Sequence, residues 1–444
     1  MRLLGNGRLI TRDSGAPYFE NGGVVMEGDS IVEVGEYAAL LEKYPQAELI
    51  DARGGVIMPG LINTHDHLRS IFSRGADIAA PPKKTFLQLL EEGSWALDRK
   101  MKRADVSAAA DCAFIECVEN GVTTVFEHHA SYGEVPGSLF AIEESAARHG
   151  VRVCLCYDIS DREGERKMKQ AVKENVEYIE HMRQTQDDRA LGVMGLNAQF
   201  TLSDATLDYC ASKAPQGAGW HLHVAEAALD VTDCLNKHGI RPLFRLYDFG
   251  IIGNKTICSH CTHVNEREMD VLKNNDALVI HNPESSMSRA TGCPPLLKLL
   301  ERGVVVGLGS DGCGADMLRA FKTASQLHKH ELSDATAVWN EIPTLLFENN
   351  AKIASRFFKR PLGVLKPGAH ADLIVLDYTP VTPMTADNFN SHILFGMNGA
   401  MTRTTIIGGE TRMLDRELIG VDKQQEYAHA AELSAELWRR MKKK

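Results

Sequence analysis

Long apolar runs are absent from this 444-residue chain. No stretch approaches the roughly 20 consecutive apolar residues that a membrane span requires. The N-terminus, MRLLGNGRLI, has Gly, Asn and Arg where a signal peptide needs a continuous apolar segment. These absences predict a protein that stays in the cytoplasm and has no membrane partner.

An excess of positive charge is also missing. Lys and Arg number 49 against 59 Asp and Glu, and the formal net charge is -10. Proteins that bind nucleic acids gather cations to neutralise phosphates, so we expect no nucleic-acid partner. The paired HxE and PCxxC motifs of zinc-dependent nucleic-acid base deaminases are absent too. The ten cysteines are scattered, which favours buried thiols over a disulfide framework.

What the chain has is a repeated alternation of strands and helices. Eight apolar, β-branched runs are separated by stretches with a helical pattern, such as TFLQLLEEGSWAL. Nearly continuous hydrophobic runs are typical of parallel strands that are covered on both faces. Eight such units predict an α/β fold, a (β/α)8 TIM-like barrel. The runs are GVIMPGLINTH, GVTTVFEHH, VRVCLCYD, ALGVMGLNAQF, GWHLHVAE, KTICSH, ALVIH and VVVGLGSD.

A second, smaller pattern flanks the barrel. Short alternating runs broken by turns fill the first 55 residues, in an antiparallel β pattern, and similar runs return in GAHADLIVLDY, TRTTIIGGE and TRMLD. They predict a small β-sandwich lobe built from both terminal segments. The predicted organisation is therefore lobe 1–55, barrel 56–363, lobe 364–422 and a C-terminal helix 423–444.

Polar side chains gather at the C-terminal ends of the eight runs, where a barrel of this kind carries its active site. Side chains two apart on a strand share a face, so His65 and His67 can enter one site while Asp66 points away. An open metal site then needs two more ligands, and the candidates are a histidine of the fifth run and Asp311. The gathered residues are His65, His67, Glu127, His128, Asp158, Gln199, His223, Glu226, His260, His281 and Asp311.

Five motifs in order, PGLINTHDH, HLHVAE, SHCTH, HNPESSM and GLGSDG, resemble the amidohydrolase superfamily. The resemblance is to its branch of cytosine, guanine and adenosylhomocysteine deaminases and ATZ/TRZ-like chlorohydrolases, and within it to the SsnA-like aminohydrolases. It covers nearly the whole chain. It implies one divalent metal, Zn²⁺ ahead of Fe²⁺, and catalytic roles for Glu226, His260 and Asp311. The implied metal ligands are His65, His67, His223 and Asp311.

The implied chemistry starts from a water molecule whose pKa the metal lowers toward roughly 7. The water attacks an sp² carbon bonded to nitrogen while Asp311 accepts its proton. His260 polarises the substrate, and Glu226 carries a proton to the departing nitrogen. His221 becomes a packing or supporting residue. His128 and His129 are interpreted as structural, and surface exposure is expected for His238, His328, His330 and His370.

The fourth run, ALGVMGLNAQF, contains no lysine that could be carboxylated to bridge two metals, so a single-metal site is predicted. Asn197 stands where adenosylhomocysteine-type deaminases have a histidine, which argues against an adenosine-like substrate. Asn197 and Gln199 could pair with an amide or lactam edge, or cap the strand. Arg74 could reach an anionic or carbonyl group, or form a surface ion pair. His281 is a candidate substrate contact or supporting residue.

The predicted function is a mononuclear metal-dependent aminohydrolase, or deaminase, that acts on a small purine- or pyrimidine-like heterocycle in purine metabolism. One alternative is the hydrolytic opening of a cyclic amide or amidine ring. A weaker one is a catalytically silent barrel that binds a ligand. The resemblance also implies a homo-oligomer.

Overall fold

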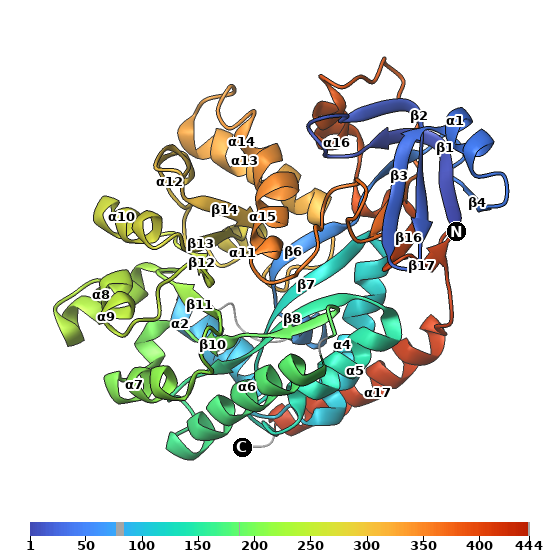
Figure 1. Ribbon diagram of the computed structural model, residues 1–444. Helices are drawn as coiled ribbons and strands as arrows, with labels where there is room; N and C mark the ends of the chain where they lie inside the picture. The colour runs from blue at the N-terminus through green and yellow to red at the C-terminus, as the bar shows by residue number, and fades with distance from the viewer. Residues whose placement is uncertain (77–83, 186, 443–444) are drawn as a thin grey trace.

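The structure, a computed structural model, describes residues 1–76, 84–185 and 187–442. Hydrogen bonding organises the strands of these residues into two sheets of nine strands each. One sheet forms the barrel and the other forms a lobe at its side, where the blue N-terminal strands lie together with red strands of residues 402–414 (Figure 1). Within the described part of the chain, none of the helices combines the length and apolarity needed to cross a bilayer.

The barrel sheet is parallel, and its neighbours follow chain order from β6 to β14, with β9 paired to β8. The ends meet where the hydroxyl of Thr64 donates to the Leu308 carbonyl at 2.8 Å. The predicted (β/α)8 barrel is confirmed. Its strands are β6 (Leu61–Asp66), β7 (Val122–His129), β8 (Arg152–Ile159), β9 (Ala190–Gly192), β10 (Met194–Leu196), β11 (Trp220–Val224), β12 (Thr256–His260), β13 (Leu278–His281) and β14 (Val305–Leu308).

Helices surround these strands and bury their outer faces (Figure 1). Every residue of β7 and β8 is buried, as continuous apolar runs require. The main helices after the strands are α4 (Arg103–Glu119), α5 (Ser138–His149), α6 (Glu165–Thr185), α7 (Asp204–Lys213), α8 (Ala228–His238), α9 (Pro242–Asp248), α10 (Glu266–Asn274), α11 (Pro283–Ser288), α12 (Leu296–Glu301), α13 (Met317–Leu332) and α15 (Asn350–Ser355). A short α3 (Trp95–Asp98) lies ahead of α4.

The first predicted run, GVIMPGLINTH, is divided between the two sheets. β5 (Val56–Pro59) pairs with lobe strands, and the barrel begins with β6 at Leu61. Gly60 joins them, and a Cβ there would collide with the side chain of Thr123. Glycine therefore lets the chain pass closely from lobe to barrel.

The lobe combines strands from both terminal segments, as predicted. β5 joins the two halves, because it pairs with β1 on one side and β15 on the other. Most pairs are antiparallel, but β4 and β5 run parallel to β1, which differs from the expected pattern. The lobe strands are β1 (Arg2–Ile10), β2 (Tyr18–Glu27), β3 (Ser30–Glu36), β4 (Glu48–Asp51), β5, β15 (Leu373–Leu376), β16 (Thr402–Ile407), β17 (Glu410–Leu414) and β18 (Glu417–Leu418).

The C-terminal helix α17 (Lys423–Lys442) packs along α4 (Figure 1). The indole of Trp438 donates to the Phe72 carbonyl at 2.8 Å, which ties the helix to the segment after β6. The helix lies in the range predicted for it, whose last two residues are outside the described part.

Candidate active site

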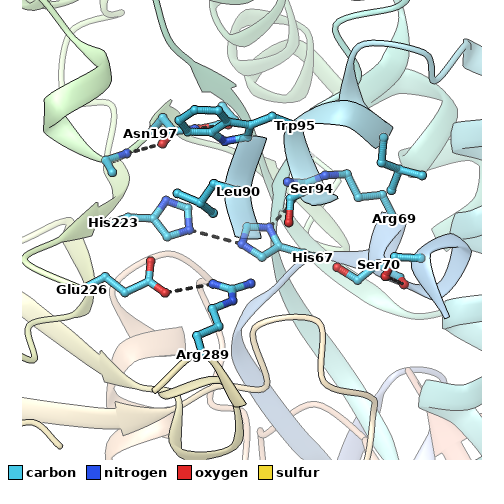
Figure 2. A pocket seen from close by; sticks show the side chains of 14 residues that line it. His67, Arg69, Ser70, Leu90, Ser94, Trp95, Asn197, His223, Glu226 and Arg289 are labelled. Atoms are coloured by element: carbon cyan, nitrogen blue, oxygen red, sulfur yellow. Dashed lines mark hydrogen bonds and ion pairs between the residues drawn. The ribbon is translucent and has the colours of Figure 1, made fainter. Parts of the chain in front are cut away.

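A pocket opens at the C-terminal ends of the barrel strands (Figure 2). Side chains reach it from β8, from β11 and from the segments that follow β6 and other strands. This is the rim where barrels of this kind carry their active sites. The lining consists of His67, Arg69, Ser70, Ser73, Leu90, Ser94, Trp95, Leu97, Asp158, Asn197, Ala198, His223, Glu226 and Arg289.

A tight turn after β14 brings Asp311 to this rim. The backbone N–H groups of Ser310 and Asp311 both donate to the His65 carbonyl at 3.0 Å. Asp311 and Gly312 have φ angles of 51° and 75°, in the left-handed region. A Cβ on Gly312 would also collide with the hydroxyl of Ser70, so the turn requires glycine. Since the turn is held against β6, Asp311 lies beside His65 on that strand and His67 just after it.

Donor atoms from five residues converge beside the pocket. The Nε2 atoms of His65 and His67 lie 3.1 and 2.9 Å from Asp311 Oδ1. His67 Nε2 is 3.2 Å from His223 Nε2. Ligands about 2.1 Å from a tetrahedral ion stand roughly 3.4 Å apart, so these spacings fit one divalent ion. Four of these five residues form a group whose donor atoms all lie within 4.8 Å of one another, and His67 is the one outside it. The four are His65, His223, His260 and Asp311.

The charge states of these groups also suit a metal. Burial lowers the pKa of His65, His67 and His223 below the usual value for histidine, so their rings are neutral and keep a free lone pair. Burial alone would raise the pKa of Asp311. Arg289 and the adjacent imidazoles of His65 and His67 outweigh burial and hold that pKa well below its usual value. Neutral imidazoles with one ionised carboxylate are a donor set for zinc.

Glu226 lies just outside this cluster, after the end of β11. Its Oε1 pairs with Arg289 Nη1 at 2.9 Å, and its Oε2 is 3.6 Å from His260 Nε2. Burial raises the pKa of Glu226 to about 7, although Arg289 opposes the shift. A carboxyl group with this pKa can both accept and release a proton near neutral pH.

Other buried groups hold His65 and His67 in place. His221 Nε2 lies 2.7 Å from His65 Nδ1, which agrees with the predicted supporting role of His221. His67 Nδ1 lies 2.6 Å from the carbonyl oxygen of His128. Contacts of this kind fix the ring orientation and the tautomer of a metal-binding histidine.

His128 takes part in the site more than its structural interpretation implies. Its ring centroid is 4.6 Å from that of His223. Its Nε2 is 3.2 Å from two carbonyl oxygens and must carry the hydrogen. Its Nδ1 is therefore an acceptor, and it faces Asp158 Oδ1 at 3.8 Å. Neither of these two atoms has a hydrogen-bond partner among the described residues.

Comparison with known proteins places this site in a family. The sequence pattern described as "Amidohydrolase family" matches residues 56–412, most of the chain. This chain belongs to the amidohydrolase family. A shorter match, to an imidazolonepropionase-like composite domain of bacteria, covers residues 22–47 of the lobe.

Similar proteins span nearly the whole amidohydrolase chain. A 5'-deoxyadenosine deaminase of Methanococcus maripaludis is 28% identical over 420 residues, which cover 93% of this chain and 96% of that one. An adenosine deaminase structure from Xanthomonas campestris, with bound zinc, has a TM-score of 0.87 at 24% identity and covers 98% of both chains. The zinc complex of an atrazine chlorohydrolase from Arthrobacter aurescens has a TM-score of 0.82 at 20% identity, over 98% of this chain and 100% of that one.

These comparisons confirm three predictions made from the sequence: the family with its branch of deaminases and chlorohydrolases, the fold, and the class of enzyme. The class is that of hydrolases acting on carbon–nitrogen bonds other than peptide bonds. The narrower resemblance to SsnA-like aminohydrolases stays a prediction.

Of the four predicted substrate contacts in this amidohydrolase, Asn197 lies in the pocket lining. Its amide donates to Asp158 Oδ2 at 2.7 Å. The structure does not bring the other three residues into this lining. The guanidinium of Arg74 forms an ion pair with Glu116, the second predicted option. Gln199 and His281 are turned toward other buried groups, at 3.4 Å from Arg245 Nη1 and 3.2 Å from His328 Nε2 respectively.

The expected exposure of His328 and His370 is wrong. Their exposed fractions are 3% and 2%. His328 contacts His281 at the inner face of α13, and His370 Nε2 pairs with Asp188 at 2.9 Å beneath the lobe. A polar residue in a helical or loop segment is buried when the tertiary structure provides it with a partner.

Arg289 is the pocket residue that sequence reasoning missed. It follows α11, and its Nη1 lies 3.0 Å from Asp311 Oδ2 as well as next to Glu226. No spacing rule marks a side chain that enters a site from beyond a short helix. The one available signal was its position eight residues after His281, at a strand end.

Proposed function

We propose that this amidohydrolase uses one divalent metal ion to hydrolyse a carbon–nitrogen bond of a purine- or pyrimidine-like heterocycle, with release of ammonia. The observation that carries the proposal is the convergence of neutral imidazoles and one carboxylate beside Glu226, a buried acid outside the cluster. The names of its relatives, 5'-deoxyadenosine deaminase and adenosine deaminase, support deamination over ring opening.

His65, His67, His223 and Asp311 are the proposed metal ligands. Three contacts between their donor atoms, at 2.9 to 3.2 Å, support this set. His260 Nε2 is farther from the carboxylate, at 3.9 Å from Asp311 Oδ2, which favours a position beside the ion over one in its coordination sphere. Three imidazoles and a carboxylate suit Zn²⁺, with Fe²⁺ as a second candidate. When bound, the ion would lower the pKa of a water molecule toward roughly 7 and so supply the nucleophile.

The protein's own groups divide the remaining work. Asp311 takes the proton of the attacking water. Burial lowers the pKa of His260 to about 4, so its ring is neutral and can hydrogen-bond the heteroatom next to the attacked carbon. Glu226, with its raised pKa, delivers a proton to the departing nitrogen, which is otherwise a poor leaving group.

Ammonia release by the zinc-loaded protein tests this proposal. The panel consists of purines, pterins and their reduced forms, with product identified by mass spectrometry. We expect one ammonia per product molecule. Ring opening without ammonia would refute the deaminase and favour the cyclic-amide alternative. Failure to bind zinc, together with no turnover, would favour the silent ligand-binding barrel.

Three further predictions concern the protein in the cell: a cytoplasmic location, a place in purine metabolism and a homo-oligomeric state. The absence of a membrane-crossing helix among the described residues is compatible with the first. Cell fractionation, metabolite profiling of a deletion strain and size-exclusion chromatography with light scattering test them in turn.

A further inference from the structure

Arg289 places a positive charge between the two acid/base carboxylates. Its Nη1 lies 2.9 Å from Glu226 Oε1 and 3.0 Å from Asp311 Oδ2. The side chain is 22% exposed, and Figure 2 shows the guanidinium beside Glu226, reaching into the pocket. A substrate held for attack between these carboxylates has to lie next to Arg289.

Most of the hydrogen-bonding capacity of this guanidinium is unused. A guanidinium has five N–H donors, and both of the ion pairs of Arg289 run through Nη1. Among the residues that the structure describes, the hydrogen bond and ion pairs of Arg289 all use Nη1, which leaves Nε and Nη2 unused. The side chain therefore offers a planar pair of nitrogens that matches an oxygen anion.

The other charges of the pocket are already balanced. Arg69 Nε pairs with Asp98 at 2.6 Å, and Arg162 Nη2 lies 2.8 Å from Asp98 and 3.6 Å from Asp158. Two arginines thus face two aspartates in one buried network. None of these four groups supplies a net charge to a ligand.

A bound divalent ion would leave the pocket with an excess of positive charge. The ion and Arg289 together carry three positive charges, and the adjacent carboxylates of Glu226 and Asp311 supply at most two negative ones. An unpaired charge in a partly buried place is costly. An anionic substrate would remove this cost, whereas an uncharged one would leave it.

We propose that Arg289 binds an oxygen anion carried by the substrate ring near the attacked carbon. The inference rests on the proposed function and deepens it, because it names the substrate class: N-heterocycles that are anions at neutral pH through a ring oxo group or a ring carboxylate. Uncharged nucleosides are poor substrates on this reasoning.

Calorimetric titration of the zinc-loaded full chain tests the proposal without turnover. The probes are two pairs of an anion and an uncharged heterocycle: urate against purine, and orotate against uracil. We expect at least one anion to bind about tenfold or more tightly than its uncharged partner, which is the effect of one charged hydrogen bond. Urate preference indicates the oxo group, and orotate preference indicates the carboxylate.

Variants assign the preference to this side chain. Arg289→Gln is expected to abolish the preference for the anion, and Arg289→Lys to keep part of it, since the charge remains but the planar fork is lost. Arg302→Gln is the matched control, because Arg302 pairs with Asp270 at 3.4 Å on the surface. Zinc content and circular dichroism confirm that each variant is folded.

Three results would overturn the proposal: equal binding of both members of each pair by the wild type, no binding of either anion, or an unchanged preference in Arg289→Gln. Ammonia release measured on the same preparations separates this failure from that of the proposed function. Turnover of uncharged heterocycles without any anion preference refutes the role of Arg289 alone. Anion binding without turnover of any heterocycle refutes the proposed function instead.

Discussion

Replacement of Glu226 by glutamine separates proton transfer from metal binding. Glutamine has the same shape and can still accept from Arg289 Nη1, at 2.9 Å in the wild type, but it cannot carry a proton. Loss of a general acid/base group typically reduces kcat by about 10² to 10⁴-fold, equal to about 3 to 5 kcal/mol of barrier. Zinc content should not change, because the nearest cluster residue, His260, lies 3.6 Å from Glu226 and is not a proposed ligand.

The folded state should tolerate this change. Removing one partner of a buried ion pair costs about 3 to 5 kcal/mol when the other charge is left uncompensated. Arg289 keeps Asp311 at 3.0 Å, so we expect the free energy of unfolding to fall by less than that. Thermal unfolding of both proteins measures the difference.

The assay is steady-state ammonia release by zinc-loaded protein, with metal content from mass spectrometry on the same samples. Glu266→Gln is the matched control. Glu266 is an exposed residue of α10, and it pairs with Lys298 of α12 at 3.2 Å. Loss of zinc together with activity would show that Glu226 is a ligand. Retention of activity within about threefold of the wild type would refute its role in proton transfer.

Three more perturbations test other parts of the site. His221→Phe removes the ring nitrogen that lies 2.7 Å from His65 Nδ1. The affinity for zinc, measured by competition with a chelator, should therefore fall about 10 to 100-fold. An unchanged affinity would contradict the supporting role of His221. Arg289→Gln removes the charge that lowers the pKa of Glu226 against burial, so the pKa of Glu226 should rise. The basic limb of the kcat/KM profile, where Glu226 loses the proton that it delivers, should therefore move to higher pH. A limb that stays or moves to lower pH argues against Glu226 as its source. Arg74→Gln breaks only the partly exposed ion pair with Glu116. The value of kcat/KM should stay the same, and the free energy of unfolding should change by less than about 1 kcal/mol. A raised KM would instead support the predicted contact between Arg74 and the substrate.

Local pattern accounts for the parts of the site that the sequence predicted. The alternation of side chains along a strand predicted that His65 on β6 and His67, just after it, reach the same site, and the same rule assigns His221 and His223 to one face of β11. Strand ends of a barrel meet at one rim, which makes Asp311 their neighbour although 244 residues separate it from His67. These inferences need only the period of a strand and the closure of the barrel.

Where a segment leaves the strand pattern, the sequence predicted less. GVIMPGLINTH reads as one run, yet the close packing of Gly60 against Thr123 divides it between two sheets. His328 and His370 look like surface residues because burial of a polar side chain depends on a distant partner, here His281 and Asp188.

The sequence by itself determined the barrel, the flanking lobe and the family, because strand periodicity and ordered motifs are properties of short segments. Only the tertiary structure decided which polar atoms are paired and which are free. It turned His128 Nδ1 toward Asp158 and set Arg289 between Glu226 and Asp311, across 63 and 22 residues of chain. Such contacts depend on where loops return over the rim. They decide the charge that a substrate meets, which no spacing of residues along the chain expresses.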